Sequence, residues 1–203
     1  LILPLQQHIG APAEPAVQPG DEVLKGEVIA RACGAVSAPV HAPTSGRIVE
    51  IADHPVPHPS GMSAPCIVLE PDGEERWTPD RTSVEDYRVL DPDDLRARIR
   101  EAGIVGLGGA AFPTFIKLDP GRQDFVETLI INGAECEPYI TSDDLLMRER
   151  SDQVVGGLQI MRHALNAGQC LIGIEDNKPE ALQSMRQAVA ALDDPKISVV
   201  ALP

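Results

Sequence analysis

Two short segments of the sequence carry residue types that could bind a nucleotide. Residues 106–117 read GLGGAAFPTFIK and combine three glycines, Gly106, Gly108 and Gly109, with one lysine, Lys117. Glycines let a backbone approach a ligand closely and turn its N–H groups toward a phosphate, and a lysine adds a point charge. The segment follows a predicted helix rather than a strand, so it is not the dinucleotide-binding fingerprint. The pattern predicts a phosphate-binding loop, with a purely structural turn as the alternative.

The second segment is an apolar strand that ends in polar residues. The run LIINGAECEP places Asn132 at the strand end, and Glu135 and Glu137 follow it. The Asn132 amide can both donate to and accept from a nucleotide ring, and Glu135 can contact sugar hydroxyls. Glu175 ends the next apolar strand, at the edge where open α/β sheets bind nucleotides. We predict all four as cofactor contacts, with capped turns and solvent-facing carboxylates as the alternative.

The other reactive residue types form no constellation for acid–base, nucleophilic or metal chemistry. The cysteines are Cys33, Cys66, Cys136 and Cys170. None belongs to a C-x-x-C pair, so neither an iron–sulfur cluster nor a structural zinc site is encoded. Two glutamates flank Cys136 and oppose thiolate formation there. His54 and His58 are four residues apart, but intervening prolines prevent a regular helix. We predict no catalytic residue, no metal site, and free thiols in a reducing compartment.

Charge and aromatic content exclude one class of partner. The 203 residues carry a formal charge of −14, with 17 Lys and Arg against 31 Asp and Glu, and they include one Trp, two Tyr and three Phe. Nucleic-acid binding needs basic patches and stacking aromatics, so it is not expected. No apolar run is long enough to span a bilayer, and no signal peptide is visible. The chain starts at Leu1 without an initiator Met, so we expect a fragment or a processed chain.

The N-terminal third has the pattern of a small all-β domain. Residues 1–76 are rich in Pro, Gly, Val and Ala, and short β-type runs alternate with turns at 22–24, 28–30, 47–51 and 66–70. Two of its segments, VQPGDEVLKG and APTSGRI, look like the halves of a biotinyl/lipoyl-type sandwich. The stretch between them, residues 27–41, contains no lysine that could be modified. We therefore predict a scaffold or docking unit rather than a swinging-arm carrier, followed by a linker at 77–90.

Residues 91–203 have the pattern of an α/β domain. A helix is expected from 91 to 103, with Asp91 as its cap and Gly103 at its end. The pattern then predicts a strand at 127–132, a helix at 143–167 closed by Gly168, a strand at 170–175, a helix at 179–192 and a strand at 197–202. This β-α-β-α-β order is typical of a Rossmann-like half-sheet with parallel strands. Leu146 and Leu158 are among the positions expected to be buried.

The chain resembles the RnfC family, a component of the Rnf ion-translocating electron transport complex. The resemblance rests on residues 106–117, 129–141 and 174–181, together with 4–10 and 37–46, so it covers nearly the whole chain with long, non-repetitive motifs. The centre is more distantly similar to the FMN- and NADH-binding subunit of respiratory complex I. Two features of this chain depart from that relative and weaken the match. The glycine loop is two residues shorter and lacks the arginines that the relative has there. Ala134 stands where the relative has an aspartate.

The resemblance implies a function and its partners. It implies an NADH-linked oxidoreductase subunit that passes electrons from NADH through FMN to iron–sulfur clusters and ferredoxin. Its partners would be the other Rnf subunits, and it would lie peripherally on the cytoplasmic face of the bacterial inner membrane, without inserting into it. The family's 4Fe-4S motifs and further nucleotide contacts are not in these residues, so the chain alone is expected to be inactive. The alternatives are a non-catalytic docking module and the related cobalamin reductase of bacterial microcompartments.

Overall fold

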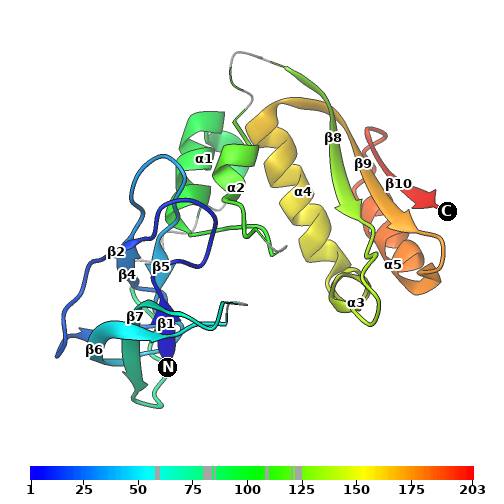
Figure 1. Cartoon of the computed structure of the whole chain (residues 1–203). Helices are drawn as coiled ribbons and strands as arrows, with labels where there is room; N and C mark the ends of the chain where they lie inside the picture. The colour runs from blue at the N-terminus through cyan, green and yellow to red at the C-terminus, as the bar shows by residue number, and fades with distance from the viewer. Residues whose placement is uncertain (58–59, 80–83, 85, 108–109, 120, 122–124) are drawn as a thin grey trace. The chain divides into compact units, whose positions relative to one another are not determined.

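A computed structural model of the chain describes residues 1–203 except 58–59, 80–83, 85, 108–109, 120 and 122–124. The chain forms two compact units (Figure 1). The first consists of Leu1–Glu85 and Arg96–Lys117, and the second of Asp86–Leu95 and Leu118–Pro203.

Two antiparallel sheets build the first unit. The four-stranded sheet has the order β1-β7-β6-β3, and the three-stranded sheet has the order β2-β4-β5. The strands are β1 (Ile2–Pro4), β2 (Glu14–Pro15), β3 (Glu22–Val23), β4 (Val28–Arg31), β5 (Val40–His41), β6 (Gly46–Pro55) and β7 (Ser63–Pro71). The four predicted strand regions fall on β3, β4, β6 and β7, whereas β1, β2 and β5 were not predicted.

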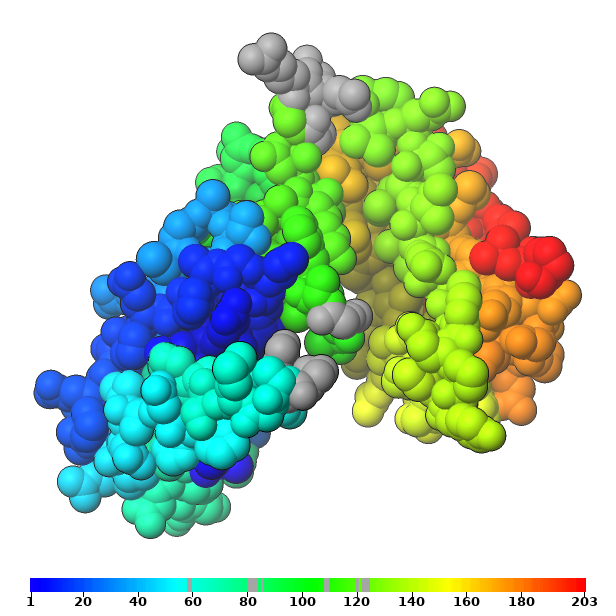
Figure 2. Space-filling view, in the orientation of Figure 1, coloured from blue at the N-terminus to red at the C-terminus, as the bar shows by residue number. Residues whose placement is uncertain are grey.

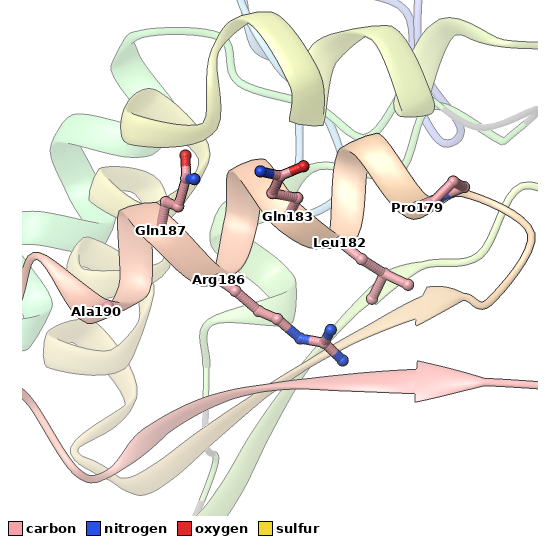
Figure 3. A pocket seen from close by; sticks show the side chains of 6 residues that line it. All are labelled: Pro179, Leu182, Gln183, Arg186, Gln187 and Ala190. Carbon is pink, nitrogen blue, oxygen red and sulfur yellow. The ribbon is translucent and has the colours of Figure 1, made fainter.

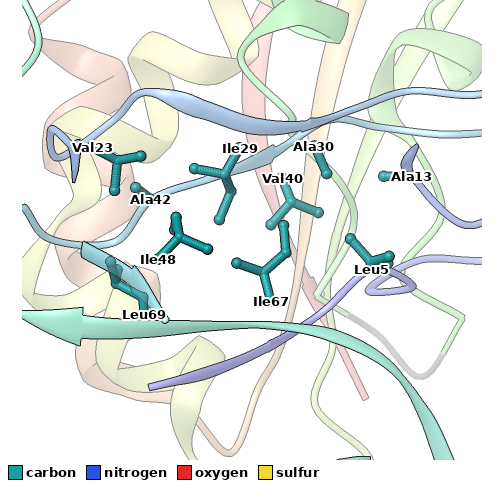
Figure 4. Packing of buried hydrophobic residues seen from close by; sticks show 10 residues of the cluster. All are labelled: Leu5, Ala13, Val23, Ile29, Ala30, Val40, Ala42, Ile48, Ile67 and Leu69. Carbon is teal, nitrogen blue, oxygen red and sulfur yellow. The ribbon is translucent and has the colours of Figure 1, made fainter. Parts of the chain in front are cut away.

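An aliphatic core joins the two sheets of this unit. Ile29 of β4, Ile48 of β6 and both Ile67 and Leu69 of β7 have no exposed surface, and Val40 of β5 packs with them (Figure 4). Full burial of such side chains contributes about 1.5–3 kcal/mol each relative to an exposed position. The buried side chains of these short strands therefore form the core of a two-sheet unit, in agreement with the all-β pattern of residues 1–76.

The first unit also includes the glycine-rich segment, which the sequence assigned to the second domain. Helix α1 (Pro92–Glu101) begins as predicted, with the backbone N–H of Asp94 donating to Asp91 Oδ1 at 2.9 Å, but the boundary between the units falls inside it. Beyond α1, Gly103 adopts φ +68° and approaches the carbonyl of Pro39 so closely that a Cβ would lie 2.8 Å away. Ile9 donates to the carbonyl of Ala110 at 3.0 Å. These backbone contacts explain why residues 96–117 group with the β-domain.

A three-stranded parallel sheet forms the centre of the second unit. The strand order is β10-β9-β8, with β8 (Val126–Gly133), β9 (Ala167–Glu175) and β10 (Ile197–Leu202). Helix α4 (Ser151–Leu165) packs on β8 and β9, α5 (Pro179–Ala190) packs on β10, and α3 (Ser142–Glu149) contacts both helices. Cys170, Ile172 and Ile174 of the central strand have no exposed surface. Figure 1 shows α3 beside the arrowhead of β8, so the carboxyl edge of the sheet lies next to this helix.

One predicted helix is wrong. Residues 143–167 form two helices, α3 and α4, separated at Arg150, whose φ of −134° departs from helical geometry. The break changes the buried face, so Met147 is buried and Leu146 is 47% exposed, whereas Leu158 is 1% exposed as predicted. Asn166, in the left-handed conformation, ends α4, and Gly168 lies inside β9 instead. Among the helices of the described residues, none has the length and apolar character needed to cross a membrane.

Candidate functional site

The glycine-rich segment forms a closed loop in the first unit. Val105 pairs with Pro113 in an antiparallel bridge, and the N–H of Gly106 donates to the carbonyl of Phe112 at 2.8 Å. The amide that was predicted to face a phosphate at Gly106 is therefore already used within the loop. Gly108 and Gly109 lie outside the described residues.

Lys117 lies directly beside Gly106. It ends the one-turn helix α2 (Thr114–Lys117), and its Nζ is 5.9 Å from the centre of the Phe112 ring. A Cβ built on Gly106 would lie 3.0 Å from Lys117 Nζ, so a larger residue at this position would press on the ammonium group. The structure thus brings together two of the predicted phosphate-binding residues, with the glycine making room for the charge rather than donating its N–H.

A cavity of about 250 Å³ adjoins this loop within the first unit. Gly106 and Leu107 line it on the loop side, and Gln7, His8 and Pro39 line it on the β-domain side. His8 is buried, and its Nε2 accepts from the N–H of Ala38 at 3.0 Å, which leaves Nδ1 to donate to the carbonyl of Ile9 at 3.0 Å. These contacts tie the His8 ring to the backbone on the β-domain side of the cavity.

In the second unit, Glu135 has a different environment from the one predicted. Its side chain is only 2% exposed, and its Oε1 accepts from the N–H of Asp143 at 2.9 Å and from Ser142 Oγ at 3.3 Å. Its Oε2 accepts from the N–H of Asp144 at 3.3 Å. The carboxylate therefore satisfies the free N–H groups at the start of α3, where a negative charge also suits the helix dipole. The Glu135 carboxylate is therefore a helix cap that faces the protein interior. The alternative drawn from the sequence was a capped turn with solvent-facing carboxylates.

Hydrogen bonds and one nearby cation keep Glu135 ionised. The pKa of Glu135 lies below its ordinary value, mainly because the backbone N–H of Asp143 donates to it, with further help from Asp144 and Ser142. Lys178 Nζ lies 3.8 Å from Glu135 Oε2 and lowers the pKa further. Lys178 was not predicted as a site residue, although its position just after β9 indicates that it lies near the carboxyl edge of the sheet.

The other predicted residues of this unit lie around Glu135. Glu175 Oε2 accepts from the N–H of Glu135 at 3.3 Å, which links the ends of β9 and β8. Asn132 is exposed, and its Oδ1 accepts from the N–H of Ala134 at 3.0 Å. Glu137 is exposed. The structure thus gathers these four residues at the carboxyl edge of the sheet. Glu135 and Glu175 hydrogen-bond within the protein, whereas the side chains of Asn132 and Glu137 are open to a ligand.

Two further cavities lie in the second unit. One, of about 420 Å³, runs along a single helix, where Leu182, Gln183 and Arg186 of α5 are among its lining residues (Figure 3). The other, of about 470 Å³, lies where β9 and β10 begin and includes Arg162, whose guanidinium contacts Asp194 at 2.6 Å. Neither cavity contains a predicted site residue. In the described residues no group of three or more His, Cys, Asp or Glu could hold a metal ion.

Comparisons with known proteins match both parts of the chain. Residues 1–74 match the family model described as the RnfC barrel sandwich hybrid domain, and residues 99–203 match the Nuo51 FMN-binding domain. The C subunit of the ion-translocating oxidoreductase complex of Pseudomonas aeruginosa is 54% identical over 100% of this chain and 26% of its own length. The same subunit from Serratia proteamaculans is 52% identical over 100% of this chain and 28% of its own length.

One solved structure is similar at lower identity. An NAD+-reducing [NiFe]-hydrogenase in the H2-reduced state is 22% identical, with a TM-score of 0.46, over 60% of this chain and 24% of that chain.

The chain thus combines a barrel sandwich hybrid domain with a domain of the Nuo51 FMN-binding type. The chain belongs to the RnfC family, as the sequence motifs predicted. It spans about a quarter of the length of these two bacterial relatives.

Proposed function

We propose that this chain is the FMN- and NADH-binding part of a peripheral subunit of an ion-translocating electron transport complex. The match of residues 99–203 to an FMN-binding domain carries the proposal. Bound FMN would accept a hydride from NADH and release electrons to iron–sulfur clusters, and the protein would supply binding and orientation. We place the 4Fe-4S clusters outside these residues, because all four cysteines are free and none has cluster spacing.

Each of the two units carries predicted residues that suit a particular kind of ligand group. The Lys117 ammonium beside Gly106 fits the FMN phosphate, since a cation next to a glycine opening offers charge without steric obstruction. The strand ends carry carboxylates, which repel a phosphate but accept hydrogen bonds from neutral hydroxyls. Asn132 and Glu137 would therefore contact the flavin ring, ribityl chain or nicotinamide ribose, while Glu135 and Glu175 position the segment between them.

The larger setting of the proposal follows from the relatives. Because they are named as the C subunit of an ion-translocating oxidoreductase complex, we propose that the partners are the other Rnf subunits and, through them, ferredoxin. The site would lie on the cytoplasmic face of the bacterial inner membrane. The second unit would contribute one half of a Rossmann-like layout, a role that its parallel β10-β9-β8 order supports.

A flavin titration tests this proposal. FMN and riboflavin differ by the phosphate, so both are titrated by fluorescence quenching against the wild-type chain and Lys117→Met. We expect Lys117→Met to weaken FMN binding about 10-fold or more, because a charged hydrogen bond is lost, and to leave riboflavin binding unchanged. Lys196→Met, which removes a charge from the cavity near Asp194, is the matched control. Equal affinity of FMN for wild type and Lys117→Met would refute the phosphate assignment, and absence of FMN binding would favour a docking module.

A further inference from the structure

The segment between β8 and α3 is a loop whose two ends are fixed. At its start, the N–H of Glu135 donates to Glu175 Oε2 at 3.3 Å. At its end, the Glu135 carboxylate holds the first turn of α3 through Asp143 and Asp144. One residue therefore closes the loop formed by residues 136–141, and Lys178 adds an ion pair to it. Figure 2 shows this yellow-green part of the chain at the surface of the second unit.

At the tip of this loop, a tyrosine occupies a strained backbone position. The N–H of Ile140 donates to the carbonyl of Glu137 at 3.3 Å, which closes a turn with Pro138 and Tyr139 at its centre. Tyr139 has φ +68°. Proline at the second position and positive φ at the third are the features of a type II turn, where glycine is the preferred third residue because a side chain is strained there. Among the described non-glycine residues with positive φ, Tyr139 is the only aromatic one.

The strain at Tyr139 is not offset by packing. The Tyr139 side chain is fully exposed, so its ring gains nothing from burial in this unit. Strained, over-determined backbone positions cluster at ligand-binding sites, and an observed outlier is a reason to look for a function. Here both ends of the loop are fixed, and the exposed Tyr139 ring lies in the loop that follows β8 at the carboxyl edge of a parallel sheet.

We propose that the ring of Tyr139 stacks on the planar ring system of a bound flavin. The inference rests on the proposed function, because the FMN-binding family identifies the planar ligand. A flavin ring offers a large flat face to an aromatic side chain, and the amide of Asn132 can meet the polar edge of the same ring. The phosphate is not needed for this contact, so the contact should be the same for FMN and for riboflavin.

Three variants of Tyr139 distinguish loss of flavin binding from loss of folding. Tyr139→Gly removes the ring and also relieves the turn, Tyr139→Leu removes the aromatic face but keeps a side chain, and Tyr139→Phe keeps the face. FMN and riboflavin are titrated against each variant, and thermal unfolding is recorded without ligand. We expect Tyr139→Gly and Tyr139→Leu to bind both flavins about 5- to 10-fold more weakly, as for loss of a stacking side chain, and Tyr139→Phe to match wild type.

The unfolding temperature shows whether lost binding is due to misfolding. We expect Tyr139→Gly to unfold about 2–6 °C higher than wild type, because glycine suits positive φ. Weaker binding in a variant that is at least as stable supports stacking. Unchanged riboflavin and FMN affinity in Tyr139→Gly and Tyr139→Leu would overturn it in favour of a protein contact, while the effect of Lys117→Met on FMN would still stand. If wild type bound neither flavin, both this inference and the proposed function would fail.

Discussion

Gly133 offers the sharpest test of how the carboxyl edge of the second unit is built. It is the last residue of β8, and a Cβ added to it would lie 2.9 Å from the carbonyl oxygen of Gly173 in β9 and 3.0 Å from Met147 Sδ in α3. Ordinary contacts of a Cβ begin near 3.4 Å. Gly133→Ala must therefore move β8 away from β9 by about 0.5 Å, or displace Met147, and overpacking of this kind costs about 1–3 kcal/mol.

The expected result is a large drop in thermal stability. The backbone of Gly133 is outside the left-handed region, so the cost arises from the steric contact alone. For a unit of this size, 1 kcal/mol changes the unfolding temperature by about 4–8 °C, so Gly133→Ala should unfold roughly 5–20 °C lower. Circular dichroism during heating measures this change. Riboflavin affinity should fall as well, because Asn132 lies directly before the displaced residue and Glu135 shortly after it.

Gly156 in α4 provides the matched control. A Cβ there would meet no other atom within 4 Å, and alanine is favoured over glycine in a helix by about 1 kcal/mol. Gly156→Ala should therefore raise the unfolding temperature under the same conditions. If Gly133→Ala unfolded at the wild-type temperature while Gly156→Ala unfolded higher, the close approach of β8, β9 and α3 would be refuted as the feature that fixes this edge.

Two further predictions concern the helices beside the site. Leu158→Ala should cost about 2–5 kcal/mol in urea unfolding because Leu158 is buried, whereas Leu146→Ala should change stability by less than about 0.5 kcal/mol because Leu146 is half exposed. Equal costs would contradict the break between α3 and α4. The lowered pKa of Glu135 means that its ionised form stabilises the fold above the ordinary value of 4.5, and that this stabilisation is lost as the pH falls toward the lower folded-state pKa. Glu135→Gln should unfold at the same temperature as wild type at low pH and at a lower temperature near neutral pH, and a constant difference at all pH values would contradict this role.

The sequence predicted the strands and the terminal signals of the second unit well, because those depend on local patterns. The bounds of β10 agree with the prediction to the residue, and Asp91 caps α1 as its type and position suggested. The break at Arg150 could not be read in the same way, because the helical periodicity continues across it. Gly168 was interpreted as a helix terminator, but its function is close packing, since a Cβ there would lie 2.9 Å from the Phe125 ring.

The compact units of the structure do not follow the order of the chain at the glycine-rich segment. The residues that follow α1 look like the start of an α/β domain because they precede its first strand in the sequence. Their contacts, however, are with the β-domain, through Ile9, Pro39 and the hydrogen bond from Arg100 Nη2 to the carbonyl of Gly34 at 3.1 Å. Such contacts join residues more than sixty positions apart, and no local pattern encodes them.

The roles of the two glutamates show why residue types alone do not define a site. Glu135 and Glu137 are two positions apart and chemically identical, so their types offer no reason to separate them. The turn at Pro138 and Tyr139 brings the chain back, so that the start of α3 meets Glu135 and leaves Glu137 exposed. One carboxylate is then used to fix the loop and the other remains available to a ligand. The same turn holds Tyr139 outward, so the capping bonds of Glu135, the strain of the turn and the exposed ring are consequences of a single loop geometry, and the Tyr139 and Glu135 variants should change flavin affinity together.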